Sequence, residues 1–139
     1  MRGLGMLGPL LVSGCATFRE LPPETRAAEA AWQAMHGIDT AQTLSIARDP
    51  DCYAENMIDP LIGRHPPQGM VLAWGVGAAA LHLAVTNILN TYTRQTVVHI
   101  WQGITIVSTA AIISHNFSIG IRFTHTEPKP GQCGEHERP

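Results

Sequence analysis

The chain has 139 residues, a formal net charge of −2 at pH 7 and 45% hydrophobic residues. This length fits one small domain, and a near-neutral chain without a basic cluster excludes binding to a nucleic-acid backbone. The charges are unevenly distributed, because Arg94 is the only formally charged side chain between His65 and Ile121. The sequence therefore indicates a long uncharged region between two charged flanks.

The N-terminal segment has one positive charge, Arg2, followed by an apolar stretch of the length of a signal-peptide core and too short to span a bilayer. The four residues that end it, Val12-Ser13-Gly14-Cys15, resemble the lipobox of bacterial lipoproteins. That resemblance implies cleavage before Cys15 and a covalent lipid on its sulfur. The alternative is an uncleaved apolar N-terminus in which Cys15 has no special role.

Residues 24–48 predict one amphipathic helix, which begins after a proline pair and ends before Pro50. Its apolar stripe is expected to pack against the rest of the domain, while its polar residues fall on another, wet face. The stripe consists of Ala31, Ala34, Met35, Ile38, Ala41 and Leu44, and the other face carries His36, Asp39, Thr40 and Thr43.

Residues 49–68 contain four prolines and are expected to form an ordered connector. The connector holds Cys52, and with Cys15 lipidated this residue and Cys133 form an even pair in a compartment that permits a disulfide. Neither has a CxxC spacing, which disfavours a structural zinc site. Because Cys133 lies in a polar tail, a disulfide and a free thiol both stay open.

Two apolar segments follow, residues 70–89 and 96–115, on either side of the polar sequence NTYTRQ. Each would form a helix about 30 Å long, which is about one hydrocarbon thickness of a bilayer. The short connection predicts an antiparallel hairpin over about residues 69–115.

The hairpin either crosses a membrane or forms the core of a soluble bundle. Small residues between Gly75 and Ala80, and Trp74 and Trp101 near opposite helix ends, favour the membrane. Polar residues within the helices lower their hydrophobicity and favour the soluble bundle. The membrane is the preferred interpretation, with hydrogen bonds across the hairpin from His82 to Thr105 or from His99 to Asn87, and with Gln102 on the same polar stripe.

After the hairpin, residues 116–124 alternate apolar with polar or small side chains, a pattern typical of a half-buried strand. A single strand cannot form a sheet, so the segment would pair with another chain, pack as an extended segment or continue as helix. Residues 125–139 predict a loose tail. The expected fold is all-α, with a signal peptide over 1–14, a tether over 15–23 and a helical domain over 24–123.

The best metal-ligand set in the sequence is His36 with Asp39, one helical turn apart, joined by Glu55 and His65 from the connector. Imidazole and carboxylate groups suit a divalent metal. The spacing differs from the HExxH pattern, however, and such residues on a wet helix face need no special role.

Haem held between His82 and His99 is a second candidate. Folding the hairpin about its turn leaves these two residues about 6 Å apart along the helix axis, which disfavours axial ligation of one iron. No catalytic residues are assigned, since the sequence has no GxSxG element and no Walker or Rossmann glycine pattern.

Over residues 29–123 the chain resembles a loose group of small bacterial and prophage-encoded lipoproteins with no established activity. The motifs that carry the resemblance are an "AWQ…D-x-x-Q-T" helix, a "G-x-HP" step and a hydrophobic hairpin. The matching residues are Ala31, Trp32, Gln33, Asp39, Gln42, Thr43, Gly63, His65 and Pro66. The resemblance implies an envelope location and no particular chemistry.

The sequence thus predicts a lipid-anchored, membrane-associated protein of the bacterial cell envelope with periplasmic exposure, in the inner or the outer membrane. It would act as a structural or interaction module whose partners are membrane lipid and either an envelope protein or a second copy, with no cofactor besides the lipid on Cys15. The alternatives are a metal- or haem-binding component of an envelope enzyme, and a soluble helical bundle that assembles with itself.

Overall fold

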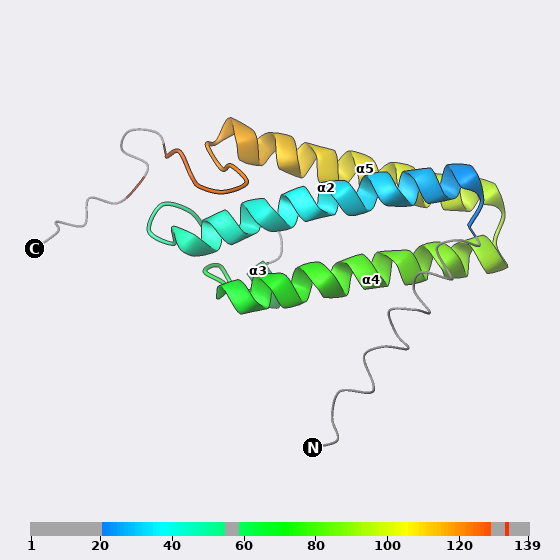
Figure 1. The fold of residues 1–139 in the computed structure, drawn as a ribbon, viewed down its shortest axis with the longest axis horizontal. Coiled ribbons are helices and arrows are strands. Elements are labelled where there is room, and N and C mark those ends of the chain that lie inside the picture. The colour runs from blue at the N-terminus through cyan, green and yellow to red at the C-terminus, as the bar shows by residue number, and fades with distance from the viewer. Residues whose placement is uncertain (1–20, 55–58, 129–132, 134–139) are drawn as a thin grey trace, which may run out of the picture.

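The computed structural model describes residues 21–54, 59–128 and 133. Three long helices form the fold, α2 (Pro23–Arg48), α4 (Gln68–Tyr92) and α5 (Gln95–Ser118), together with the single turn α3 (Asp59–Ile62). Figure 1 shows the long helices side by side, with α2 and α5 running in one direction and α4 in the other. The all-α class and the apolar hairpin predicted from the sequence are confirmed.

Prolines and short polar segments define the helix ends. α2 has Pro23 at its first position, where a missing N–H is tolerated, and ends before Pro50. α4 begins directly after Pro67. The turn between α4 and α5 is only two residues long, and Thr93 closes it by donating its hydroxyl to the Leu89 carbonyl at 2.6 Å.

α2 packs against both helices of the hairpin, and it contacts each of them more extensively than they contact each other. Figure 1 shows α2 between α5 and α4 along nearly their whole length. The hairpin is therefore not a self-contained unit, because α2 supplies much of the surface that each of its helices buries.

The face that α2 buries differs from the predicted apolar stripe. Ala31 and Ala34 are exposed, and the other four stripe residues are only partly buried. His36, expected on the wet face, is only 9% exposed. The physical reason is that α4 and α5 present polar groups to α2, so its polar side chains are the ones that find partners. The buried residues are Thr25, Glu29, Trp32, His36, Gln42, Thr43, Ser45 and Ile46.

The outer faces of α4 and α5 are apolar and exposed. Both helices have the length and composition of a membrane span, yet only 22% and 17% of their most apolar stretches are buried inside the protein. Their buried positions include the polar side chains of His82, Thr86, Gln102 and Thr109. The large apolar side chains that point outward are Met70, Leu72, Val76, Leu81, Ile88, Tyr92, Val97, Ile100, Ile104 and Val107.

A small apolar cluster closes the end of the bundle where α2 and α5 terminate. Ile46, Tyr53 and Ile121 are buried together, and the Tyr53 hydroxyl donates to the Ile119 carbonyl at 2.9 Å. Gly120 has a φ of 94°, and a Cβ there would lie 2.2 Å from the Glu127 carbonyl oxygen, so a side chain at this position would be strained.

The strand suggested by the alternation after the hairpin does not form as such. α5 continues through Phe117 to Ser118, and the following segment makes one antiparallel bridge, between Ile121 and Thr126. The alternating residues 116–124 do not share one conformation, because the chain changes from helix to a tight return after Ser118. The segment folds back on its own chain.

A disulfide ties the tail to the bundle, and a group of exposed charges lies within the return itself. The Sγ atoms of Cys52 and Cys133 are bonded at 2.03 Å, which joins the segment after α2 to the tail. On the surface, the His125 hydrogen bond and the Arg122 guanidinium hold the pKa of Glu127 below its usual range. These exposed charges add little to stability.

The contact between Gly75 and Thr40 tests the packing of α2 on α4. A Cβ on Gly75 would lie 2.7 Å from Thr40 Cγ2, whereas Gly77, two residues along α4, has open space. Alanine favours a helix over glycine by about 1 kcal/mol, but overpacking costs about 1–3 kcal/mol. We expect Gly75→Ala to melt at a lower temperature than Gly77→Ala in detergent, measured by circular dichroism. Equal melting temperatures would contradict this packing.

Candidate functional site

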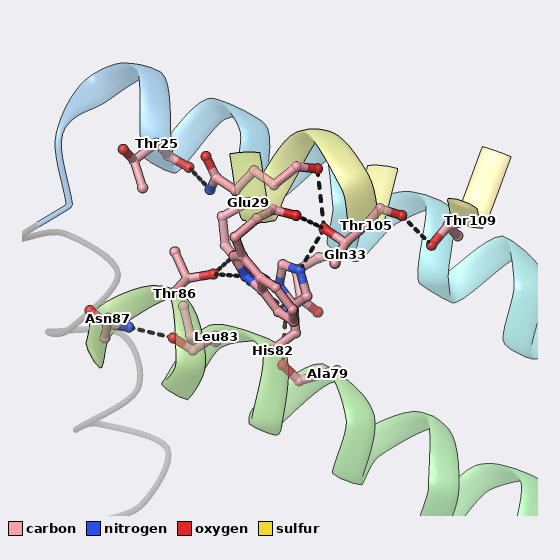
Figure 2. A network of polar contacts seen from close by, with 12 residues as sticks. Thr25, Glu29, Gln33, Ala79, His82, Leu83, Thr86, Asn87, Thr105 and Thr109 are labelled. Atoms are coloured by element: carbon pink, nitrogen blue, oxygen red, sulfur yellow. Dashed lines mark hydrogen bonds and ion pairs between the residues drawn. The ribbon is translucent and has the colours of Figure 1, made fainter. Parts of the chain in front are cut away.

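The centre of the bundle holds a carboxylate and an imidazole that are both buried. Glu29 of α2 is 0% exposed and His82 of α4 is 4% exposed. The Nδ1 atom of His82 lies 3.1 Å from Oε1 and 3.0 Å from Oε2 of Glu29. Figure 2 shows the two side chains meeting between the helices. A buried carboxylate requires such partners, because burying an isolated charge is unfavourable.

Two more donors complete the surroundings of the Glu29 carboxylate. The Thr86 hydroxyl donates to Oε2 at 2.8 Å, and Gln33 Nε2 donates to Oε1 at 2.8 Å. The same Gln33 amide also donates to the Ala79 carbonyl at 3.0 Å. Glu29 therefore accepts hydrogen bonds from its own helix and from α4, and these bonds to an ionised group are of the strong kind.

On the far side of His82, its Nε2 atom lies 3.0 Å from the hydroxyl of Thr105 in α5. That hydroxyl also lies 3.1 Å from the carbonyl oxygens of Trp101 and of Gln102. Thr105 has one proton to donate. If the proton goes to a helix carbonyl, His82 donates from both nitrogens as an imidazolium; if it goes to Nε2, His82 is neutral. In both states Nδ1–H of His82 donates to Glu29, so one side chain links three helices.

Aromatic rings cover the faces of the His82 imidazole. The Trp32 ring stacks on it with centroids 3.6 Å apart and planes 7° apart, and the Trp101 ring lies 5.0 Å away. Trp101 was expected at a membrane interface, but it points into the bundle and donates from Nε1 to the Thr86 hydroxyl at 3.2 Å. Aromatic faces attract cations and exclude water, so they suit an imidazole paired with a carboxylate.

Polar side chains also join α2 to α5 on either side of the centre. Near the start of α2, Gln102 Nε2 donates to the Thr25 carbonyl at 2.8 Å. Near its end, Asn116 Nδ2 donates to Gln42 Oε1 at 3.1 Å. Among the buried side-chain oxygens and nitrogens of the part of the chain that the structure describes, Gln102 Oε1 is the one without a hydrogen-bond partner. The contact surface of α2 is thus polar over most of its length.

Of the two hydrogen bonds predicted across the hairpin, one pair of residues is in contact and the other is not. His82 and Thr105 are in contact, at the distance given above. Asn87 instead donates to the Leu83 carbonyl of its own helix at 2.8 Å, and His99 is exposed. Because His82 is buried and its two nitrogens face Glu29 and Thr105, the structure does not bring His82 and His99 together as haem ligands.

The predicted metal-ligand set is not assembled among the described residues. His36 Nε2 lies 2.9 Å from the Gly75 carbonyl, and the His36 ring stacks on Trp32. His65 is exposed, Asp39 is half-buried, and Glu55 lies outside the described residues. Residues 21–54, 59–128 and 133 contain no group of three or more histidine, cysteine or acidic side chains placed to hold a metal ion. Cys15 also lies outside the described residues.

Sequence reasoning missed Glu29, Trp32 and Thr86, the partners that define the site. A signal for Glu29 and Trp32 was present in the sequence. Together with two further residues they recur at helical spacing among alanines, in the series Thr25, Glu29, Trp32 and His36. Reading the alanines as the core-facing stripe hid this polar and aromatic face. Nothing in α2 alone identifies Thr86, which is placed by the packing of α4.

Comparisons of the chain with known protein families, with curated proteins and with solved structures found no match.

The order of contacts, carboxylate to imidazole to hydroxyl, is that of a hydrolytic triad. Here, however, the Thr105 hydroxyl contacts two carbonyls of its own helix, and Trp32 and Trp101 lie against the imidazole. The arrangement serves best as a tie between α2, α4 and α5. Its chemistry is the mutual satisfaction of buried polar groups.

A double-mutant cycle tests this tie. Leaving a buried hydrogen-bonding group without its partner costs about 1–3 kcal/mol, and more if the group is charged, so Glu29→Gln and His82→Gln should each destabilise the bundle in detergent. Because both changes remove the same contact, the double variant should be less destabilised than the sum, by about 0.5–3 kcal/mol. Circular dichroism during unfolding measures all three variants.

The matched control is Asp51→Asn, which removes a carboxylate at an exposed position. It should change the free energy of unfolding by no more than about 0.5 kcal/mol. Additive single effects in the Glu29 and His82 cycle would show that the two side chains do not stabilise the bundle through one another.

Proposed function

We propose that this protein is a small membrane-embedded structural or interaction module of the bacterial cell envelope, in which α4 and α5 lie in the bilayer. The observation that carries the proposal is the inverted distribution of side chains. Polar groups such as Glu29, His82 and Gln102 fill the interior, while large apolar side chains cover the outer faces of α4 and α5.

This distribution of polar and apolar side chains is the opposite of the one that is stable in water. In a soluble bundle the large aliphatic residues would be buried, and an extended exposed apolar surface would promote association. In hydrocarbon, by contrast, aliphatic side chains face lipid without cost and polar side chains join helices. Leu81 in the middle of α4 is 65% exposed and Val107 in the middle of α5 is 69% exposed, as expected for lipid-facing positions.

Helix length and charge placement support the same function. α4 has 25 residues and α5 has 24, which corresponds to about 36 Å for each helix and exceeds the roughly 30 Å hydrocarbon core. Arg94 lies in the turn at one end of the hairpin, while Arg64 and Arg122 lie at the other end. These three guanidinium groups thus fall outside the apolar zone of α4 and α5.

The interior polar network favours a structural or interaction role over catalysis, because its members are used to hold the helices together. Membrane lipid is then the first partner of the module, and a second envelope protein or a second copy would contact it within the bilayer. Lipid attachment at Cys15 is a separate prediction from the sequence and is not needed for the insertion of α4 and α5.

Alkaline carbonate extraction tests insertion directly. With Cys15→Ala, which removes any lipid anchor, the protein should stay in the membrane pellet, because two apolar helices hold it. Release into the supernatant would mean that the protein is peripheral or a soluble assembly, and the proposal would fail.

A matched pair of lysine variants sharpens this test. Leu81→Lys places a charge in the middle of the apolar outer face, at a cost of about 3 kcal/mol in a bilayer. Thr91→Lys adds the same charge at an exposed position near the end of α4. We expect Leu81→Lys to lower the membrane-inserted fraction and Thr91→Lys to leave it unchanged. Equal behaviour of the two variants would count against a lipid-facing Leu81.

A further inference from the structure

We propose that α2 is a third membrane-spanning helix. Its polar residues lower the hydropathy of its sequence, but they face α4 and α5 and not the lipid. The inference rests on the proposed insertion of α4 and α5, and it extends that function by fixing the number of crossings. Of the described helices, only α4 and α5 are apolar enough in sequence to be recognised as spans. The exposed surface of α2, rather than its whole composition, is what would meet lipid.

α2 extends along the whole length of the hairpin, so it would cover the same depth of the bilayer. At one end the Thr25 hydroxyl donates to Gln95 at 3.4 Å, beside the turn between α4 and α5. At the other end Gln42 contacts Asn116, close to the end of α5. With 26 residues, α2 is as long as the two apolar helices. A helix packed against both of them over this length must lie in the bilayer if they do.

The outward face of α2 is compatible with hydrocarbon. Between Glu29 and Arg48 the only formally charged residue is Asp39, which is half-buried and has a partner in the structure. The exposed positions along this stretch and the turn before it are small and without polar side chains. They are Ala27, Ala30, Ala31, Ala34 and Gly37.

The hairpin requires this arrangement. His82 and Thr86 of α4 reach the Glu29 carboxylate of α2, and Gln102 of α5 reaches the Thr25 carbonyl. If α2 lay outside the bilayer, these side chains would face lipid without their partners, and unsatisfied polar groups in hydrocarbon are strongly unfavourable. Insertion of all three helices as one unit leaves the polar groups paired.

Three crossings place the two ends of the bundle on opposite sides of the membrane. The start of α2 and the Arg94 turn share one side, and Arg64 and the Cys52–Cys133 disulfide share the other. Disulfides persist in oxidising compartments, so the disulfide side faces the periplasm and Arg94 faces the cytoplasm. The start of α2 then lies on the cytoplasmic side, which is incompatible with periplasmic lipidation of Cys15.

Cysteine labelling of the full-length protein tests this topology. In a Cys15→Ser background, the variants Glu24→Cys, Arg64→Cys and Arg94→Cys each add one thiol at an exposed position, while Cys52 and Cys133 are bonded to each other. Spheroplasts are treated with a membrane-impermeant biotin maleimide before or after permeabilisation. We expect Arg64→Cys to label in intact spheroplasts, and Glu24→Cys and Arg94→Cys to label only after permeabilisation.

The other patterns separate the possible failures. Labelling of both Glu24→Cys and Arg64→Cys in intact spheroplasts, with Arg94→Cys protected, would leave α4 and α5 as spans and overturn the third crossing. Labelling of all three variants without permeabilisation would contradict membrane insertion itself. External labelling of Glu24→Cys and Arg94→Cys but not Arg64→Cys would overturn the periplasmic placement of the disulfide. An intact mass of the wild-type chain with a lipid on Cys15 would overturn that placement as well.

Discussion

A buried carboxylate needs hydrogen-bond donors close to it, and this requirement organises the whole bundle. Glu29 of α2 obtains donors from His82 and Thr86 of α4 and from Gln33 of its own helix. His82 in turn reaches Thr105 of α5. Because no pair of helices satisfies this set of groups, α2 must pack against both helices of the hairpin, and the polar contact fixes their relative positions.

The same requirement explains the distribution of side chains. Once the polar residues of three helices face one another, the aliphatic residues are left on the outside, as Leu81 and Val107 show. Such a surface is unfavourable in water and suitable in hydrocarbon. The polar interior thus supports the proposed membrane location. The end of the bundle where α2 and α5 terminate is held separately by the Cys52–Cys133 disulfide and the Tyr53 cluster.

The sequence predicts the helices better than it predicts their faces. Prolines, the NTYTRQ turn and the uncharged region place α2, α4 and α5 to within a few residues. The predicted buried face of α2 was wrong, because alanines such as Ala31 were assigned to the apolar stripe that packs against the domain, whereas Ala31 is exposed. Glu29 was not identified, since its burial depends on His82, which lies 53 residues away. Likewise, the return at Gly120 depends on its contact with Glu127 and not on the local alternation.

The most direct test of the account is the environment of the outer helix faces in liposomes. Spin labels would be attached to the variants Ala34→Cys on α2 and Leu81→Cys on α4, in a Cys15→Ser background, with Arg64→Cys as a solvent-exposed reference. The account predicts that dissolved oxygen relaxes the labels at 34 and 81 more strongly than a water-soluble nickel chelate does, with the reverse at 64. Stronger relaxation by the nickel chelate at 34 and 81 would show that these faces meet water and would contradict the account.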